Sequence, residues 1–166
     1  MLFRSDDNII NPVGQFVIET TFLIIDSIDP DNETNTIQIG KTTSVGCGAE
    51  INWSYGIAFN RSGEFSFYFT PGFGAVTGAG LSASPSITFS TAKTMDDVGG
   101  WGMDLGGGFS IPIYGPLGVG AGYDYSASQT ARSHTYSISA GMGYLPVEFH
   151  SHITYTFCFG RNNVYE

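Results

Sequence analysis

The chain has 166 residues and a net charge of −9, with six lysines and arginines against fifteen aspartates and glutamates. Nucleic-acid binding needs basic side chains to neutralise phosphates, so this charge balance excludes a nucleic acid as an expected partner. Charged residues make up only 13% of the chain, and glycine contributes 23 residues. Soluble domains usually carry about 25% charged residues. A surface this poor in charge fits lipid, a partner or a larger assembly better than free solution.

The N-terminal part of the chain differs from the rest. Met1–Ser5 has neither the basic start nor the apolar run of a secretory signal. It could be a cloning artefact, in which case the natural polypeptide extends upstream. Residues 16–25 have apolar spacing that fits one face of a helix and β-branched residues that fit a strand equally well. We expect a short helix or strand that covers a barrel end, within an N-terminal segment 1–41 that includes an acidic connector at 29–32.

From residue 42 onward, bulky apolar residues alternate with glycine, serine and threonine. The most regular stretch is 45–59, where the odd positions are mostly large and apolar and the even positions are small or polar. A period of two predicts β-strands with one apolar face. Turn sequences rich in glycine, asparagine and proline separate the segments, so neighbouring strands should run antiparallel. We place strands at 44–59, 64–76, 81–92, 101–113, 117–128, 133–144 and 147–159, with a further strand from either 36–40 or 16–25.

These segments predict an all-β fold, an antiparallel meander closed into a barrel of about eight strands. We assign residues 42–160 to the barrel and 161–166 to a tail. No apolar run reaches the ~18 residues that a membrane-spanning helix needs. Cys47 and Cys158 fall on opposite faces of their strands, so we expect both to be unpaired.

The direction of the apolar face is left open by the sequence. If it points inward, it fills the barrel, but glycine and serine would then cover the outside, which is unusual. If it points outward, strands of about twelve residues tilted by ~40° are ~30 Å tall, close to the thickness of a hydrocarbon core, around a wet lumen. Trp53 and Tyr55 lie in mid-strand, where lipid-facing aromatic residues are uncommon, and this favours the inward direction.

Three polar residues share one face of the last predicted strand: Glu148, His150 and His152. Two imidazoles and a carboxylate could bind a metal if the strand bends or a neighbour contributes a ligand, or they could act as a general acid and base. Ordinary polar residues at a strand end give the same pattern. His134 and Arg132, at the start of the preceding strand, could lie across from them.

Asp104 and Asp124 lie on the polar face of adjacent strands and could approach each other. Such a pair could serve glycoside chemistry, or it could simply face a solvated lumen. The glycine-rich pieces 106–108 and 118–122 are surrounded by strands, and no helix with a lysine follows them, so they do not indicate a phosphate loop. We therefore name no catalytic residue and no cofactor-binding residue, and we expect no cofactor.

Several segments together resemble a known group of domains: Gly63–Thr70, the glycine-rich run to Gly80, Thr94–Gly100 and Val147–Thr156. They resemble the glycine-rich, strand-rich domains at the C-terminal ends of bacterial RHS-repeat and other polymorphic-toxin-like proteins. The resemblance covers about residues 42–159. It depends on the glycine-rich composition and strand pattern rather than on invariant motifs, so it transfers no functional residue. It implies a module of a larger polypeptide that is secreted or associated with the cell envelope.

The first functional hypothesis is a non-enzymatic effector or toxin-type C-terminal domain that acts at a membrane, in contact with lipid, as a small β-barrel. The alternative is a soluble barrel that binds a hydrophobic ligand or a partner protein through four interior aromatic residues: Trp53, Tyr55, Tyr123 and Tyr125. A third hypothesis is a metal-dependent enzyme that uses the carboxylate and histidines of the last strand.

Overall fold

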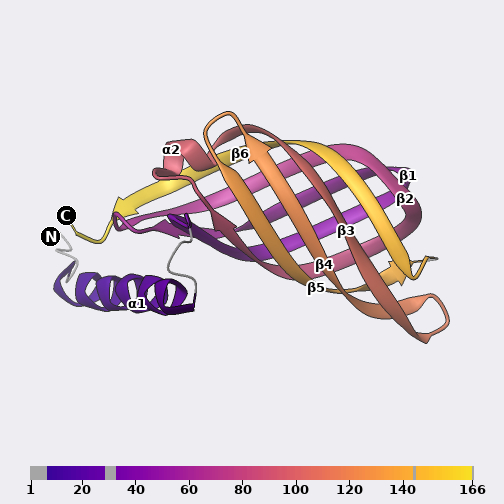
Figure 1. Ribbon diagram of the computed structural model, residues 1–166, viewed down its shortest axis with the longest axis horizontal. Helices are drawn as coiled ribbons and strands as arrows, with labels where there is room; N and C mark the ends of the chain where they lie inside the picture. Colours follow the sequence, from indigo (N-terminus) through magenta and orange to yellow (C-terminus); the bar gives the residue numbers. More distant parts are fainter. Residues whose placement is uncertain (1–6, 29–32, 144, 166) are drawn as a thin grey trace, which may run out of the picture.

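A computed structural model describes residues 7–28, 33–143 and 145–165 (Figure 1). The predicted acidic connector at 29–32 and the first five residues lie outside the described residues. None of the described helices is both long and apolar enough to cross a lipid bilayer. The elements in chain order are α1 (Asp7–Ile28), β1 (Thr36–Asn60), β2 (Glu64–Ser90), α2 (Met95–Val98), β3 (Gly100–Tyr114), β4 (Leu117–Ser128), β5 (Arg132–Gly143) and β6 (Val147–Asn163).

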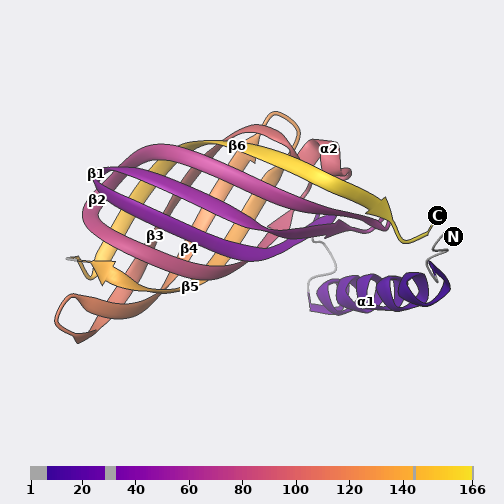
Figure 2. The same cartoon turned by 180° about the vertical axis from the view of Figure 1, so that it is seen from behind.

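The strands form a closed antiparallel barrel (Figures 1 and 2). The first half of β2 pairs with β6, and its second half pairs with β5. β4 and β3 complete the ring between β5 and β6, and β1 pairs with β2 from Thr36 to Phe59. Because every pairing is antiparallel, the prediction of an antiparallel β-barrel is confirmed. The predicted meander is wrong, because β2 pairs with β5 and β6 rather than with β3, and β6 pairs with β3 rather than with β5.

The two long strands turn back on themselves at one end of the barrel. The hydroxyl oxygens of Thr42 and Ser54 in β1 lie 2.7 Å apart. A Cβ added to Gly56 would overlap the carbonyl oxygen of Ile39. An extended strand would hold Thr42 and Ser54 ~40 Å apart. Gly48, whose φ of 75° favours glycine, lies at the reversal. β2 is paired with β1 on both sides of this reversal, with a register shift between Cys47 and Ala49, so both strands cross the barrel wall twice (Figure 2).

The number of strands differs from the prediction of about eight. The structure has six, of which β2, β3, β4, β5 and β6 close the ring, with β1 paired to β2 beside it. β1 joins the expected strands 36–40 and 44–59, because residues 41–43 are also paired with β2, and β2 joins the expected strands 64–76 and 81–92. The strands extend from Thr36 to Asn163, beyond the predicted limits of 42–160.

The apolar face of the barrel points outward. Leu105 in β3, Ile138 in β5 and Phe149 in β6 are 65%, 69% and 63% exposed, and the other strands repeat the pattern. The opposite face carries the serine, threonine and glycine residues and lines the interior. The barrel therefore encloses a polar lumen rather than an apolar core, and of the two directions left open by the sequence the structure shows the outward one.

A small apolar core lies between α1 and one end of the barrel. Its buried members are Ile18 and Phe22 of α1 and Ile37 and Phe59 of β1. The helical alternative for residues 16–25 is thus the observed one, and the helix lies beside one end of the barrel (Figure 1). Cys47 and Cys158 are both free thiols, as predicted.

Arg61, directly after β1, links α1 to the barrel. Its guanidinium forms two hydrogen bonds with the Asp26 carboxylate of α1, and its Nε donates to the carbonyl oxygen of Thr34 at 2.7 Å. The guanidinium carbon also lies 4.4 Å from the centre of the Phe22 ring, within the range of a cation–π contact. One side chain therefore holds the helix through charge, hydrogen bonds and ring contact together.

The segment between the predicted strands 81–92 and 101–113 contains the four-residue helix α2. Thr94 caps this helix, and the Thr94 and Asp97 side chains bond each other's backbone amides in a capping box. Arg161 hydrogen-bonds the Asp96 carboxylate and holds the pKa of that carboxyl below its usual value. α2 is thereby fixed to the end of β6.

Candidate functional site

The barrel lumen is the candidate functional site, with a cavity volume of about 880 Å³. Residues from all six strands line it. Asp97 and Gly100 line it at the end that carries α2, and Pro116 and Glu148 line it at the opposite end. The cavity therefore runs along the length of the barrel.

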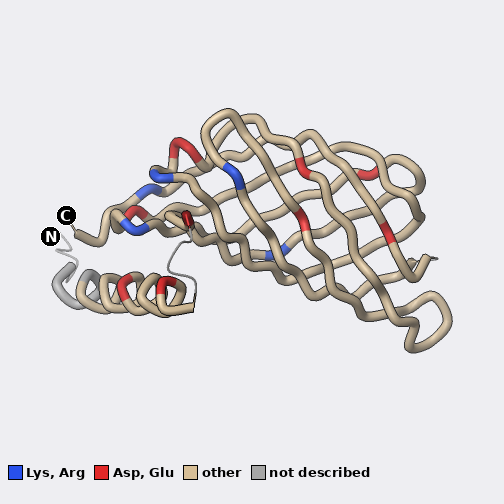
Figure 3. The backbone as a smooth tube through the Cα atoms, in the orientation of Figure 1, with Lys and Arg blue, Asp and Glu red and all other residues tan. Residues whose placement is uncertain are grey.

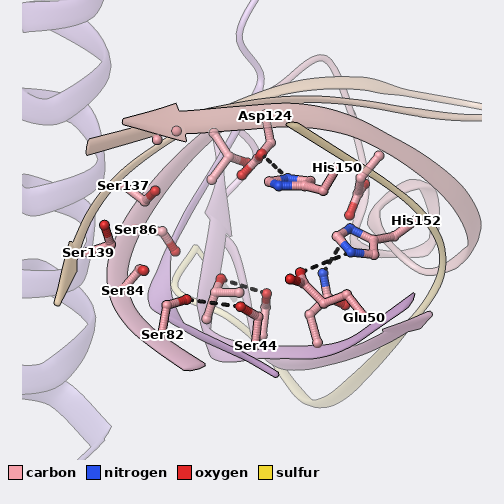
Figure 4. Close-up of a pocket in the computed structure, with 18 of the residues that line it drawn as sticks. Ser44, Glu50, Ser82, Ser84, Ser86, Asp124, Ser137, Ser139, His150 and His152 are labelled. Atoms are coloured by element: carbon pink, nitrogen blue, oxygen red, sulfur yellow. Dashed lines mark hydrogen bonds and ion pairs between the residues drawn. The ribbon is translucent and has the colours of Figure 1, made fainter. Parts of the chain in front are cut away.

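One wall of the lumen is covered by hydroxyl groups (Figure 4). The second half of β2 and its partner β5 place these groups there, because alternate residues of both strands face inward. The hydroxyls of Thr88 and Thr135 are 2.7 Å apart, and those of Ser44 and Ser82 are 2.9 Å apart. The hydroxyl wall consists of Ser82, Ser84, Ser86, Thr88, Ser133, Thr135, Ser137 and Ser139.

Ionisable side chains and one asparagine gather on another part of the lumen wall, as Figure 4 shows for four of them. We call this group the acid–histidine cluster: Glu50 and Asn52 of β1, Asp104 of β3, Asp124 of β4, and Glu148, His150 and His152 of β6. Four strands contribute to it, so it exists only in the closed barrel.

Each histidine of the cluster lies against a carboxylate from a different strand. His150 Nε2 is 2.7 Å from Asp124 Oδ1. His152 Nε2 is 3.0 Å from Glu50 Oε1, a close contact without hydrogen-bond alignment, while His152 Nδ1 and Asn52 Nδ2 are hydrogen-bonded at 3.1 Å. The side chains of His152 and Glu50 are only 1% and 6% exposed. The centres of the two imidazole rings are 4.8 Å apart, so the two contacts form one continuous group.

Glycines on the intervening strands allow these contacts. Gly106 of β3 lies in register between Asp124 and His150, and a Cβ added to it would overlap the Asp124 carboxylate. Gly74 of β2 lies in register between Glu50 and His152, and a Cβ there would overlap a backbone carbonyl of β6. Side chains from strands that are not neighbours can therefore meet above a strand that has no side chain at that position.

The three last-strand residues proposed from the sequence all line the lumen. Glu148 Oε1 is 3.6 Å from His150 Nδ1, whereas His152 lies against Glu50. Within residues 7–28, 33–143 and 145–165, no group of three or more histidine, cysteine, aspartate and glutamate side chains is arranged to hold a metal ion. The imidazoles are instead placed to form pairs with carboxylates.

Asp104 and Asp124 both line the lumen, as expected for polar residues on adjacent strands. Their register is offset, because Asp124 lies opposite Gly106 and Asp104 lies opposite Ser126. Asp104 is also the register partner of His152 on β6. The two carboxylates therefore belong to the acid–histidine cluster, each with its own neighbours.

Other predicted site residues lie outside the lumen. His134 is exposed and its Nδ1 is 2.6 Å from the hydroxyl of Tyr123, so it does not join the cluster. Arg132 is exposed at the start of β5. Tyr55 and Tyr123 are 45% and 42% exposed on the apolar outer face. None of the four aromatic residues suggested as ligand-lining is among the lumen residues: Trp53, Tyr55, Tyr123 and Tyr125.

Two members of the cluster, Glu50 and Asn52, were missed by the sequence analysis. Glu50 is the only charged residue between positions 44 and 59, and it occupies the small-residue face of the strand. A lone carboxylate on that face is the signal that could have identified it, because the face lines an enclosed space when the apolar residues point outward. No family model, curated protein or solved structure matches this chain.

Proposed function

We propose that this chain forms a small transmembrane β-barrel, with lipid against its outer face and water in its lumen. The observation that supports this most strongly is the distribution of side chains, which is the reverse of that in a water-soluble protein. Large apolar residues are exposed on every strand, while hydroxyls, carboxylates and imidazoles face the interior. The strands of the closed ring, β2 to β6, also satisfy their backbone hydrogen bonds with one another, as a bilayer requires.

The height of the apolar outer face agrees with a bilayer. On β3 the exposed apolar residues extend from Trp101 to Ile113, which are 67% and 69% exposed. About twelve steps at ~3.3 Å give ~40 Å along the strand, and a tilt of ~40° leaves ~30 Å along the barrel axis. The apolar residues of β6 between Val147 and Phe159 cover the same number of steps. A hydrocarbon core is ~30 Å thick.

Aromatic residues on the outer face gather toward the end that carries α2. The rings of Trp101, the second residue of β3, and Tyr155 are 5.1 Å apart there. Such rings are typical of the boundary between lipid and water. Lys41 is an exception, since this charged side chain is exposed on the apolar face of β1. A lysine stem can lie along apolar surface while its amine reaches toward the headgroups.

The alternative of a soluble barrel that binds a hydrophobic ligand receives less support, because an apolar ligand in this lumen would desolvate hydroxyls and carboxylates without replacing their hydrogen bonds. The more specific part of the proposal is an effector or toxin-type module of a larger secreted or cell-envelope protein. That part depends on the sequence resemblance alone, whereas the barrel form depends on the arrangement of the residues.

A charge placed on the outer face tests membrane insertion. Leu105, in the middle of β3 and 65% exposed, should contact lipid. We expect Leu105→Arg to lower the free energy of unfolding in phosphatidylcholine vesicles by ~2–4 kcal/mol, the cost of arginine near the bilayer midplane. Gln129→Arg, in an exposed turn between β4 and β5, is the matched control and should fold like the unmodified protein.

The measurement is urea unfolding in vesicles, with protease protection as a second readout. The proposal is overturned if the unmodified protein stays monomeric in buffer without detergent and does not associate with vesicles. Equal stabilities of Leu105→Arg and Gln129→Arg in vesicles would also overturn it, because the outer face of β3 would then not contact lipid.

A further inference from the structure

We infer that the lumen conducts cations in preference to anions; this inference rests on the proposed transmembrane barrel. The lumen runs along the barrel, and its lining contains carboxylates in several places. Among the described residues that line it there is no lysine and no arginine. The acidic residues and histidines of the lining are Glu50, Asp97, Asp104, Asp124, Glu148, His150 and His152.

The basic residues of the chain lie outside this lining, as the charge distribution in Figure 3 illustrates. Lys41 is on the outer face, and Arg61 binds Asp26 of α1. Arg161 binds Asp96 of α2. The remaining described basic residues, Lys93 and Arg132, are exposed on or beside the loops at the α2 end. Negative charge inside the lumen is therefore not neutralised by lysine or arginine from the wall.

The histidines do not reverse this balance. Protonation of His150 and His152 would offset the charge of their two carboxylate partners, Asp124 and Glu50. Three further carboxylates line the lumen, those of Asp97, Asp104 and Glu148. The lumen therefore keeps a surplus of negative charge when both imidazoles are protonated. The sign of the preference is accordingly the same whether the imidazoles are neutral or charged.

The surroundings strengthen the effect of these charges. A narrow aqueous lumen with low-dielectric walls focuses the field of its charged groups and raises the local concentration of counter-ions. Oxygen atoms of hydroxyls and carboxylates can also replace part of the hydration shell of a cation, as in ion-selective pores. The hydroxyl wall and the acid–histidine cluster supply such oxygens from different parts of the lumen wall (Figure 4).

The experiment is a reversal-potential measurement across a planar phosphatidylcholine bilayer that separates two concentrations of potassium chloride. For the unmodified protein we expect a permeability ratio of K⁺ over Cl⁻ on the order of 10. Glu148 is the suitable residue to change, because its side chain lines the lumen and is 39% exposed, so its replacement leaves the buried contacts of His152 in place. Glu148→Gln should lower the ratio, and Glu148→Lys should lower it further.

The matched control is Glu19→Gln, which removes an exposed carboxylate of α1 outside the lumen and should leave the ratio unchanged. Insertion is followed separately by protease protection in vesicles. Failure to insert would overturn the transmembrane barrel and this inference together. Insertion without ion current, or with a preference for chloride, would overturn the inference and leave the barrel intact. A ratio that is the same in Glu148→Lys and the unmodified protein would also overturn it.

Discussion

Replacing Gly106 with alanine tests how the acid–histidine cluster is assembled. In the folded barrel the new Cβ would overlap the Asp124 carboxylate and lie 2.8 Å from His150 Nε2. The carboxylate has to rotate away, because the backbone of β3 is held by hydrogen bonds on both sides. The 2.7 Å contact between Asp124 and His150 is then lost.

The size of the effect follows from two opposing contributions. A hydrogen bond that involves a charged group contributes ~1.5–3 kcal/mol to stability. Replacing glycine with alanine raises the free energy of unfolding by ~0.4–1 kcal/mol, because alanine lowers the conformational entropy of the unfolded chain. We therefore expect Gly106→Ala to lower the free energy of unfolding by about 1–2 kcal/mol, measured by urea titration in lipid vesicles with tryptophan fluorescence as the signal.

Gly102→Ala is the matched control, because Gly102 lies on the same face of the same strand. A Cβ there would be 3.2 Å from Thr154 Oγ1, which a small adjustment relieves, so we expect a change within ~0.5 kcal/mol. In the background of Asp124→Ala, the cost of Gly106→Ala should largely disappear. The reasoning is refuted if Gly106→Ala and Gly102→Ala are equally stable, or if Asp124→Ala leaves the cost of Gly106→Ala unchanged.

Two further substitutions test the outer face and the helix. Lys41→Leu removes a charge from the apolar face of β1 and should raise the free energy of unfolding in vesicles, by up to ~2–4 kcal/mol if Lys41 lies near the bilayer midplane and by less near a headgroup layer. An unchanged or lower stability would contradict the contact of this face with lipid. Arg61→Ala removes the ion pair with Asp26 and the ring contact with Phe22. We expect the stability of the docked helix to fall by about 1–2 kcal/mol, so that protease cleaves α1 sooner while the barrel stays protected. Equal rates of cleavage in α1 with and without Arg61 would show that other contacts hold the helix.

The alternation of residue types predicted the strands of the barrel because each strand can be recognised from its own residues alone. Strand segments such as 101–113 and 117–128 are identified by a two-residue period of apolar side chains and by the turn sequence that follows. The predicted limits of these segments lie within one residue of the observed strands β3 and β4. The strand number was wrong because β1 stays paired with β2 through 41–43, between two predicted segments, and because β2 is a single strand across the predicted gap at 77–80.

The direction of the apolar face depends on the whole barrel rather than on any one strand, so alternation left it open. Trp53 and Tyr55 argued for the inward direction on the basis of their position in mid-strand. In the structure they follow the same face as Ile51, which is 53% exposed. What decides the direction is the volume of the opposite face. Serine and glycine are too small to fill the interior, and a cavity of about 880 Å³ remains when they face inward.

The acid–histidine cluster could not be predicted from the sequence, because it depends on the register of pairing across three strands. Alternation places His150, Gly106 and Asp124 on the inner faces of three separate strands, but a shift of two residues in either pairing would keep those faces and separate the side chains. The same holds for His152, Gly74 and Glu50. In both rows glycine occupies the middle strand, so the small residues that make the lumen wide also let charged residues from non-neighbouring strands meet. The apolar outer face and the negative charge of the lumen thus come from one pattern of residues. In this pattern the outer positions are large and apolar, and the inner positions are small unless they carry charge.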